Sequence, residues 1–152
     1  MPKPHPQTST LGILGEELVA RWLQGGGWEI LHRRWRCRWG ELDVVARGSG
    51  IAFVEVKTRS RGNWDEDGLL AIDRRKQEKL IQTAELYLAE FAELANLPCR
   101  FDVALVRCDR TSRADGLLPS QWEFPDAIAL RVPVEVAGYR LTLQNYIESA
   151  FD

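Results

Sequence analysis

Residues 40–59 of the chain read GELDVVARGSGIAFVEVKTR. Two apolar runs, Glu41–Arg47 and Ile51–Thr58, flank the short loop Gly48-Ser49-Gly50, and this pattern predicts a β-hairpin. Apolar side chains fall on both faces of the two strands, with Leu42, Val44 and Ala46 on one face and Val45 and Phe53 on the other. A sheet that is apolar on both faces needs helices on both sides. The hairpin therefore predicts the centre of a layered α/β sheet.

The segments on either side of the hairpin supply the helices and further strands. Apolar residues recur at helical spacing over residues 11–24 and again from residue 72 or 73, whereas residues 28–35 and 101–107 resemble strands. Elsewhere we expect loops at residues 59–69 and 109–126, a strand at residues 127–132 and a short helix at residues 144–151. This order predicts an α/β fold, with a mixed β-sheet flanked by helices on both faces.

Length and composition favour one folded domain. The chain has 152 residues, of which 45% are hydrophobic and 28% are charged, as is typical of a globular protein. No linker or internal repeat divides the sequence. We therefore expect residues 11–152 to form a single domain behind a flexible N-terminal tail of residues 1–10.

Charge and cysteine content exclude several classes of protein. The 20 Lys and Arg residues against 22 Asp and Glu give a net charge of -2, so nucleic-acid binding would have to rely on local clusters of charge. No apolar run approaches the roughly 18 residues of a membrane span, and the N-terminus lacks the pattern of a signal peptide. The three cysteines contain no CxxC motif, which excludes a zinc ribbon. The sequence predicts a cytoplasmic protein without a membrane partner.

The hairpin also predicts a cluster of charged side chains. If the loop has three residues, Arg47 faces Ile51, and stepping back along the strands places Asp43 opposite Glu55. The same register sets Glu41 opposite Lys57, so that all four polar groups share one face.

Opposed carboxylates about 5 Å apart repel each other by roughly 3 kcal/mol at an effective dielectric constant near 20. A shared proton, a nearby cation or a divalent metal would offset that cost. Oxygen ligands favour Mg²⁺ or Mn²⁺, and Lys57 would then lie beside the reacting centre. The alternative interpretation is a solvated network of salt bridges with no metal.

Glu16 is a further candidate for the same cluster. Glu17, Arg21 and Gln24 fall on the polar arc of the first helix, whereas Glu16 lies outside it. A carboxylate on the apolar side of a helix needs a partner, because burying it alone costs several kcal/mol. That partner is either an arginine or a metal with its water shell.

The segment of residues 31–39, LHRRWRCRW, interleaves arginines with tryptophans and contains no acid. Such a pattern suits phosphate backbones and exposed bases. The candidate nucleic-acid-binding residues are Arg33, Arg34, Arg36 and Arg38, with Arg59 after the hairpin. The alternative is an arginine face in water with both tryptophans in the core.

The motifs taken together resemble a known family. They are Gly15-Glu16, Gly40-Glu41-Leu42-Asp43, Phe53-Val54-Glu55-Val56-Lys57-Thr58-Arg59, Arg100-Phe101-Asp102-Val103 and the ending Tyr146-Ile147-Glu148-Ser149-Ala150-Phe151. In these motifs the chain resembles the uncharacterised bacterial YraN-like family. That family is similar to Holliday junction resolvases and to the PD-(D/E)xK, or restriction-endonuclease-like, nucleases.

The resemblance implies a role for individual residues. Asp43, Glu55 and the backbone carbonyl of Val56 would be metal ligands, Lys57 would activate or orient the attacking water, and Glu16 would support the metal shell. It implies a single restriction-endonuclease-like domain and Mg²⁺-dependent or Mn²⁺-dependent hydrolysis of phosphodiester bonds in DNA, including branched DNA. A homodimer would suit a junction that offers two related strands. The alternatives are a non-catalytic nucleic-acid-binding module on the same fold and a protein-interaction domain.

Overall fold

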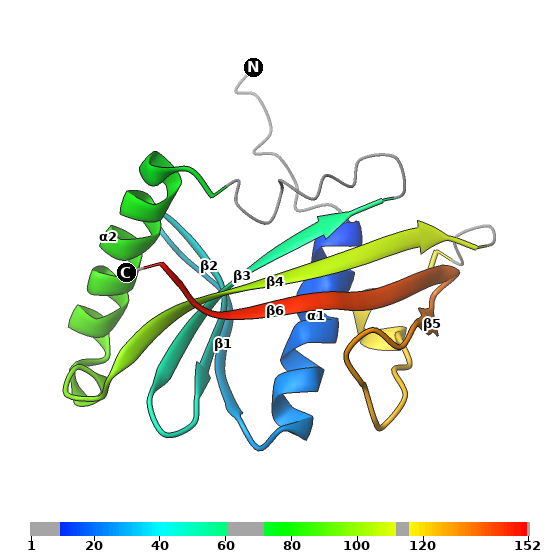
Figure 1. Cartoon of the computed structure of the whole chain (residues 1–152), viewed down its shortest axis with the longest axis horizontal. Helices are drawn as coiled ribbons and strands as arrows, with labels where there is room; N and C mark the ends of the chain where they lie inside the picture. Colours follow the sequence, from blue (N-terminus) through cyan, green and yellow to red (C-terminus); the bar gives the residue numbers. More distant parts are fainter. Residues whose placement is uncertain (1–9, 61–71, 112–115, 152) are drawn as a thin grey trace.

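The computed structural model describes residues 10–60, 72–111 and 116–151. Helices, strands and short 3-10 turns alternate along the chain (Figure 1). In chain order they are α1 (Thr10–Gly25), β1 (Glu29–Cys37), β2 (Gly40–Arg47), β3 (Ile51–Arg59), α2 (Arg74–Glu90), η2 (Ala92–Leu94), β4 (Cys99–Arg110), η3 (Pro119–Gln121), β5 (Val134–Val136) and β6 (Tyr139–Phe151).

The strands form one mixed sheet in the order β1-β2-β3-β4-β6-β5. Among the strands of the described residues, only β3 and β4 run parallel, and the other neighbours are antiparallel. Helix α2 lies between β3 and β4 in the chain, so it provides the crossover that a parallel pair requires. The observed fold is the restriction-endonuclease-like α/β architecture that the sequence predicts.

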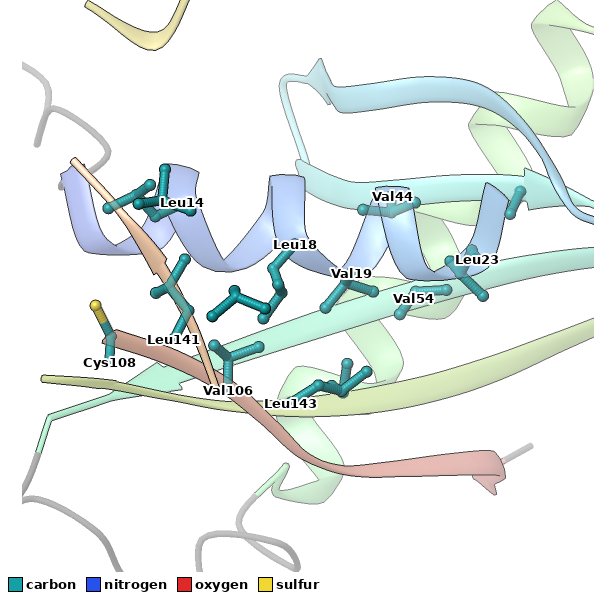
Figure 2. Packing of buried hydrophobic residues seen from close by; sticks show 14 of the residues in the cluster. Leu14, Leu18, Val19, Leu23, Val44, Val54, Val106, Cys108, Leu141 and Leu143 are labelled. Carbon is teal, nitrogen blue, oxygen red and sulfur yellow. The ribbon is translucent and has the colours of Figure 1, made fainter. Parts of the chain in front are cut away.

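The two helices cover opposite faces of the sheet. Helix α1 directs Leu14, Leu18 and Leu23 onto the face of the sheet that carries Val44 and Val54 (Figure 2). The other face carries Val45 and Phe53, which form a second core with α2 residues Leu80, Ala84 and Tyr87. Because side chains alternate along a strand, this division confirms that the hairpin is apolar on both sides.

The predicted hairpin register is confirmed where β2 and β3 are paired. Arg47 faces Ile51, and Val45 faces Phe53. The paired register ends at Val44 and Val54, one residue before Asp43 would meet Glu55. Leu42, predicted on the face of Val44, instead belongs to the core under α2, so the alternation of β2 shifts between these two residues. The two strands therefore separate where the charged residues begin.

A close approach of α1 to β3 fixes the position of Glu16. A Cβ atom at Gly15 would overlap Oγ1 of Thr58 on β3. Only glycine allows the helix to lie this near the strand, because any other residue would push α1 away from the sheet. Glu16 follows directly and is 8% exposed.

Two elements in the second half differ from the sequence prediction. Residues 144–151 belong to strand β6 rather than to a short helix, because they pair with β4, for example Ile147 with Val103. Residues 127–132 form no strand, since Arg131 adopts a φ of 66° and its N–H donates to the carbonyl of Leu143. Backbone pairing, which local pattern does not reveal, overrides the helical spacing in the first case.

Some predictions fall on residues outside the described ranges. These are most of the tail at residues 1–10, of which Thr10 begins α1, and most of the loop at residues 59–69. Within residues 109–126, β4 continues to Arg110 and η3 forms a short turn. No helix in the described part of the chain is long and apolar enough to span a membrane.

Candidate metal centre

Three carboxylates from two elements converge beside the separation of β2 and β3. Glu16 of α1 and Glu41 and Asp43 of β2 each place one oxygen within 4.8 Å of the others. At such distances like charges repel by several kcal/mol in a partly desolvated site. The arrangement is therefore stable only with protons, cations or a bound metal between the oxygens.

Asp43 is held by the backbone of the neighbouring strand. The N–H of Val56 donates a hydrogen bond of 2.9 Å to Oδ2 of Asp43. Burial, and next the negative charge of Glu55, raise the pKa of Asp43 well above its usual value, while the hydrogen bond from Val56 opposes this. The predicted opposition of Asp43 and Glu55 lies beyond the paired register, and their roles as metal ligands stay a prediction.

Glu16 lacks a full set of partners. Burial raises the pKa of Glu16 to about 7, and the nearby charge of Arg34 opposes the shift. The Nε atom of Arg34 lies 3.3 Å from Oε2 of Glu16, yet this buried oxygen accepts no hydrogen bond. Arg34 has a φ of 49°, a backbone conformation that costs about 1 kcal/mol for a residue other than glycine. Of the two partners left open by the sequence, the structure places an arginine beside Glu16, and a metal stays a prediction.

Glu55 and Lys57 are two residues apart on β3, and both are buried. Lys76 of α2 places its Nζ atom 2.7 Å from Oε1 of Glu55. Burial, and next the positive charges of Lys76 and Arg59, lower the pKa of Lys57. A lysine in this setting can exchange a proton more readily than an ordinary surface lysine.

The predicted opposition of Glu41 and Lys57 is not part of the paired register, which ends at Val44. Glu41 instead accepts a hydrogen bond of 2.7 Å from Nε of Arg36 on β1. The physical reason is the register of β1 and β2, which places Arg36 directly opposite Glu41.

The carboxylates open into a cleft of about 480 Å³. Glu41, Asp43 and Glu55 line its acidic side. The opposite side is basic and comes from α2, which contributes Arg75, Lys76 and Lys79. Helix α2 begins here because Asp73 accepts a hydrogen bond of 2.8 Å from the N–H of Lys76 as its N-cap.

The basic side of the cleft was missed by the sequence analysis. Arg75 and Lys79 are four residues apart and so share one face of the helix, which is a usable signal. The sequence alone gives no indication that this face meets the carboxylates, because the contact depends on how α2 packs on the sheet.

The arginines predicted to bind nucleic acid are placed outside this cleft. Three of them are paired with acids, Arg33 with Glu17, Arg34 with Glu16 and Arg36 with Glu41. The guanidinium of Arg38 lies 4.8 Å from the ring centroid of Trp39, and Arg59 donates to the carbonyl of Thr58. Their role in binding stays a prediction. Of the two tryptophans, Trp35 packs on the core under α2, whereas Trp39 is 50% exposed.

The donor set suits a hard divalent cation. Glu16, Glu41 and Asp43 offer carboxylate oxygens within reach of one another, and Glu16 Oε2 is buried without a hydrogen bond. Oxygen-only sites with an open side favour Mg²⁺ or Mn²⁺. The residues present therefore fit the metal that the fold implies. Glu55 lies next to Asp43 and lines the same cleft, but Lys76 engages one of its oxygens.

Fold and site together define an α/β protein of restriction-endonuclease-like architecture with a carboxylate cluster in a cleft. The sequence profile of the uncharacterised protein family UPF0102 matches residues 15–106, and the chain belongs to this family. The chain is 54% identical to a UPF0102 protein of Trichodesmium erythraeum, with 92% of this chain and 87% of the relative covered. It is 46% identical to a UPF0102 protein of Acaryochloris marina, with 99% and 95% covered. The names of these relatives state no activity.

Proposed function

We propose that the chain is a nuclease that uses Mg²⁺ or Mn²⁺ to hydrolyse phosphodiester bonds in DNA, including branched DNA. The observation that carries this proposal is the juxtaposition of a carboxylate cluster and a basic helix face across one cleft. A phosphodiester bears negative charge, so cations from the protein and a bound metal stabilise the further charge that develops when water attacks.

Each candidate residue has a role in this proposal. Asp43 and Glu55 would hold the ion, with Glu16 and the backbone carbonyl of Val56 in support. Glu41 joins them because its carboxylate lies in the same cluster. A divalent cation supplies Lewis-acid chemistry, which polarises a phosphoryl oxygen and acidifies water.

The other groups act on the substrate and its proton. Lys57 would activate or orient the attacking water, the role that the resemblance implies for it, and it lies two residues from Glu55 on β3. Arg75 and Lys79 line the cleft opposite the acids, where they bind phosphate oxygens by charge. The predicted arginines of β1 would extend the contact along the DNA. Each would then exchange its carboxylate partner for a phosphate of the DNA backbone.

The experiment is a cleavage assay on an end-labelled four-way DNA junction, a single strand and a linear duplex, with Mg²⁺, Mn²⁺ or EDTA. We expect cleavage only with metal, and its loss in Asp43→Asn and Glu55→Gln. Glu135→Gln is the matched control, because Glu135 is an exposed acid on β5 paired with Arg140.

Cleavage that persists in Asp43→Asn or in EDTA would contradict the proposal. A protein that binds these DNAs without cleaving any of them would support the alternative, a non-catalytic nucleic-acid-binding module. The Lys76–Glu55 ion pair is the observation that favours this second candidate, because it neutralises an expected metal ligand.

A further inference from the structure

Trp39 is unusually placed for a tryptophan. It lies between β1 and β2, is 50% exposed and lines the cleft of the carboxylates. Large aromatic side chains are generally buried, since they carry much apolar surface. In the described ranges no other aromatic ring packs against Trp39. Packing in the hydrophobic core therefore does not explain why a tryptophan occupies position 39.

One contact of Trp39 and one of its neighbour Gly40 position the indole. The guanidinium of Arg38 lies 4.8 Å from the ring centroid, so a cation supports the indole. Gly40 packs against α2, where an added Cβ would come within 3.0 Å of Oγ1 of Thr83. This approach brings Trp39 to the rim of the cleft that α2 bounds. The indole ring is therefore held in place at the rim of the cleft, although half of its surface is exposed.

The same cleft is lined by Trp39, by basic side chains and by carboxylates. Arg75 and Lys79 line it from α2, whereas Asp43 and Glu55 line its acidic side. A nucleotide carries the complementary groups, an apolar base with a flat face and an anionic phosphate. Bases stack on exposed aromatic side chains while basic residues follow the backbone, which is how proteins commonly bind single strands.

We propose that Trp39 stacks on an unpaired base while Arg75 and Lys79 bind the adjacent phosphates, so that the cleft selects single-stranded segments of DNA. The inference rests on the proposed function, because it names the substrate feature that the same cleft recognises. It adds a specificity residue outside the motifs of the resemblance.

The dimensions and chemistry of the cleft favour an unpaired nucleotide over a duplex. Its volume of about 480 Å³ is that of a pocket for one small ligand. Bases within a duplex already stack on each other, so their faces are not available to an indole. Because every base has a π-face, the contact selects strand state and not sequence. A junction, flap or gap offers such bases next to paired DNA.

The test is a binding assay in EDTA, where hydrolysis is absent. Fluorescein-labelled oligo-dT, an abasic oligonucleotide of equal length and a blunt duplex are titrated with the full chain, and anisotropy is followed. We expect wild type to bind oligo-dT about tenfold more tightly than either other probe. Trp39→Ala should bind all three alike, while Trp39→Phe should keep most of the preference. Leu118→Ala is the control, because Leu118 is 64% exposed and does not line the cleft.

Equal affinity of wild type for oligo-dT and the abasic probe would overturn the inference, as would an unchanged preference in Trp39→Ala. If Trp39→Ala does not fold, Trp39→Phe still tests the inference, because its preference for oligo-dT over the abasic probe is measured separately. The proposed function fails by a different result, namely metal-independent cleavage or cleavage retained in Asp43→Asn. The two failures are therefore distinguishable.

Discussion

The Nζ atom of Lys76 lies 2.7 Å from Oε1 of Glu55, so a cation of α2 engages a carboxylate that is expected to hold a metal. Lys76 and a metal would compete for the same oxygen of Glu55. The side chain of Lys76 is about half exposed, so it can turn away from Glu55 into solvent. In the proposed site the lysine would turn to the phosphate when a metal is bound.

Replacing this lysine should therefore strengthen metal binding. We expect Lys76→Ala to bind Mn²⁺ about fivefold more tightly than wild type in the absence of DNA, equivalent to about 1 kcal/mol for a partly exposed pair. Calorimetric titration measures the change. Arg74→Ala, which removes a neighbouring charge that does not line the cleft, is the control. Weaker Mn²⁺ binding by Lys76→Ala would show that the lysine does not compete.

Glu16 predicts how stability depends on pH. Its pKa rises from 4.5 to about 7 on folding, so the folded state holds the proton more tightly than the unfolded state. The free energy of unfolding should therefore fall as pH rises through this range, by up to about 3 kcal/mol, and level off above it. Asp43, whose pKa is also raised, adds to the fall.

Glu16→Gln should remove its share of this dependence. Urea unfolding at about pH 5 and about pH 8 without divalent metal measures the effect, and the variant should be the more stable protein at the higher pH. If the free energy of unfolding changes by the same amount between the two pH values in wild type and in Glu16→Gln, Glu16 is not the cause of the pH dependence. Added Mn²⁺ should restore more stability to wild type than to Glu16→Gln at the higher pH.

Asp102 should prove structural. It is fully buried and accepts hydrogen bonds from Arg100, from the hydroxyl of Tyr146 and from the N–H of Ser149, which tie β6 to β4. Asp102→Ala removes the acceptor that these donors share and should destabilise the fold by about 3 kcal/mol. Urea unfolding would detect this, and Asp109→Ala at the end of β4 is the control. If Asp102→Ala is as stable as wild type, the structural role of Asp102 is wrong.

The basic face of α2 should determine how DNA binding depends on salt. Loss of both Arg75 and Lys79 to alanine should reduce the slope of log affinity against log salt by about 1.5, close to one unit for each phosphate contact. The comparison is Arg34→Ala with Arg36→Ala, which tests the predicted arginines of β1. If only this second pair lowers the slope, DNA lies along β1 instead of across the cleft.

The hairpin and its two helices could be predicted from sequence because their signals are local. The loop Gly48-Ser49-Gly50 sets the register that pairs Val45 with Phe53, and helical spacing marks Leu14 and Leu18 as the inner face of α1. Strand β6 could not be predicted, since residues 144–151 become a strand only through their pairing with β4.

The acids of the candidate site and Lys57 could be named from the sequence, whereas the cations of α2 could not. Asp43 and Glu55 follow from extending the hairpin register, which is paired only as far as Val44 and Val54, and Glu16 follows from its position outside the polar arc of α1. Arg75, Lys76 and Lys79 meet these acids only because α2 packs on the face of Phe53. The ion pair of Arg34 with Glu16 likewise depends on a local backbone conformation, with φ at 49°, that the sequence does not reveal.

The most direct test of the central claim is calorimetric titration of Mn²⁺ and Mg²⁺ into wild type and Asp43→Asn, because it needs no knowledge of the substrate. The variant keeps the shape of the side chain and removes one of the repelling charges, so the fold is expected to persist, as circular dichroism would check. We predict that wild type binds both ions and that Asp43→Asn binds neither. Equal binding of Mn²⁺ by the two folded proteins would contradict the assignment of this cluster as a metal centre.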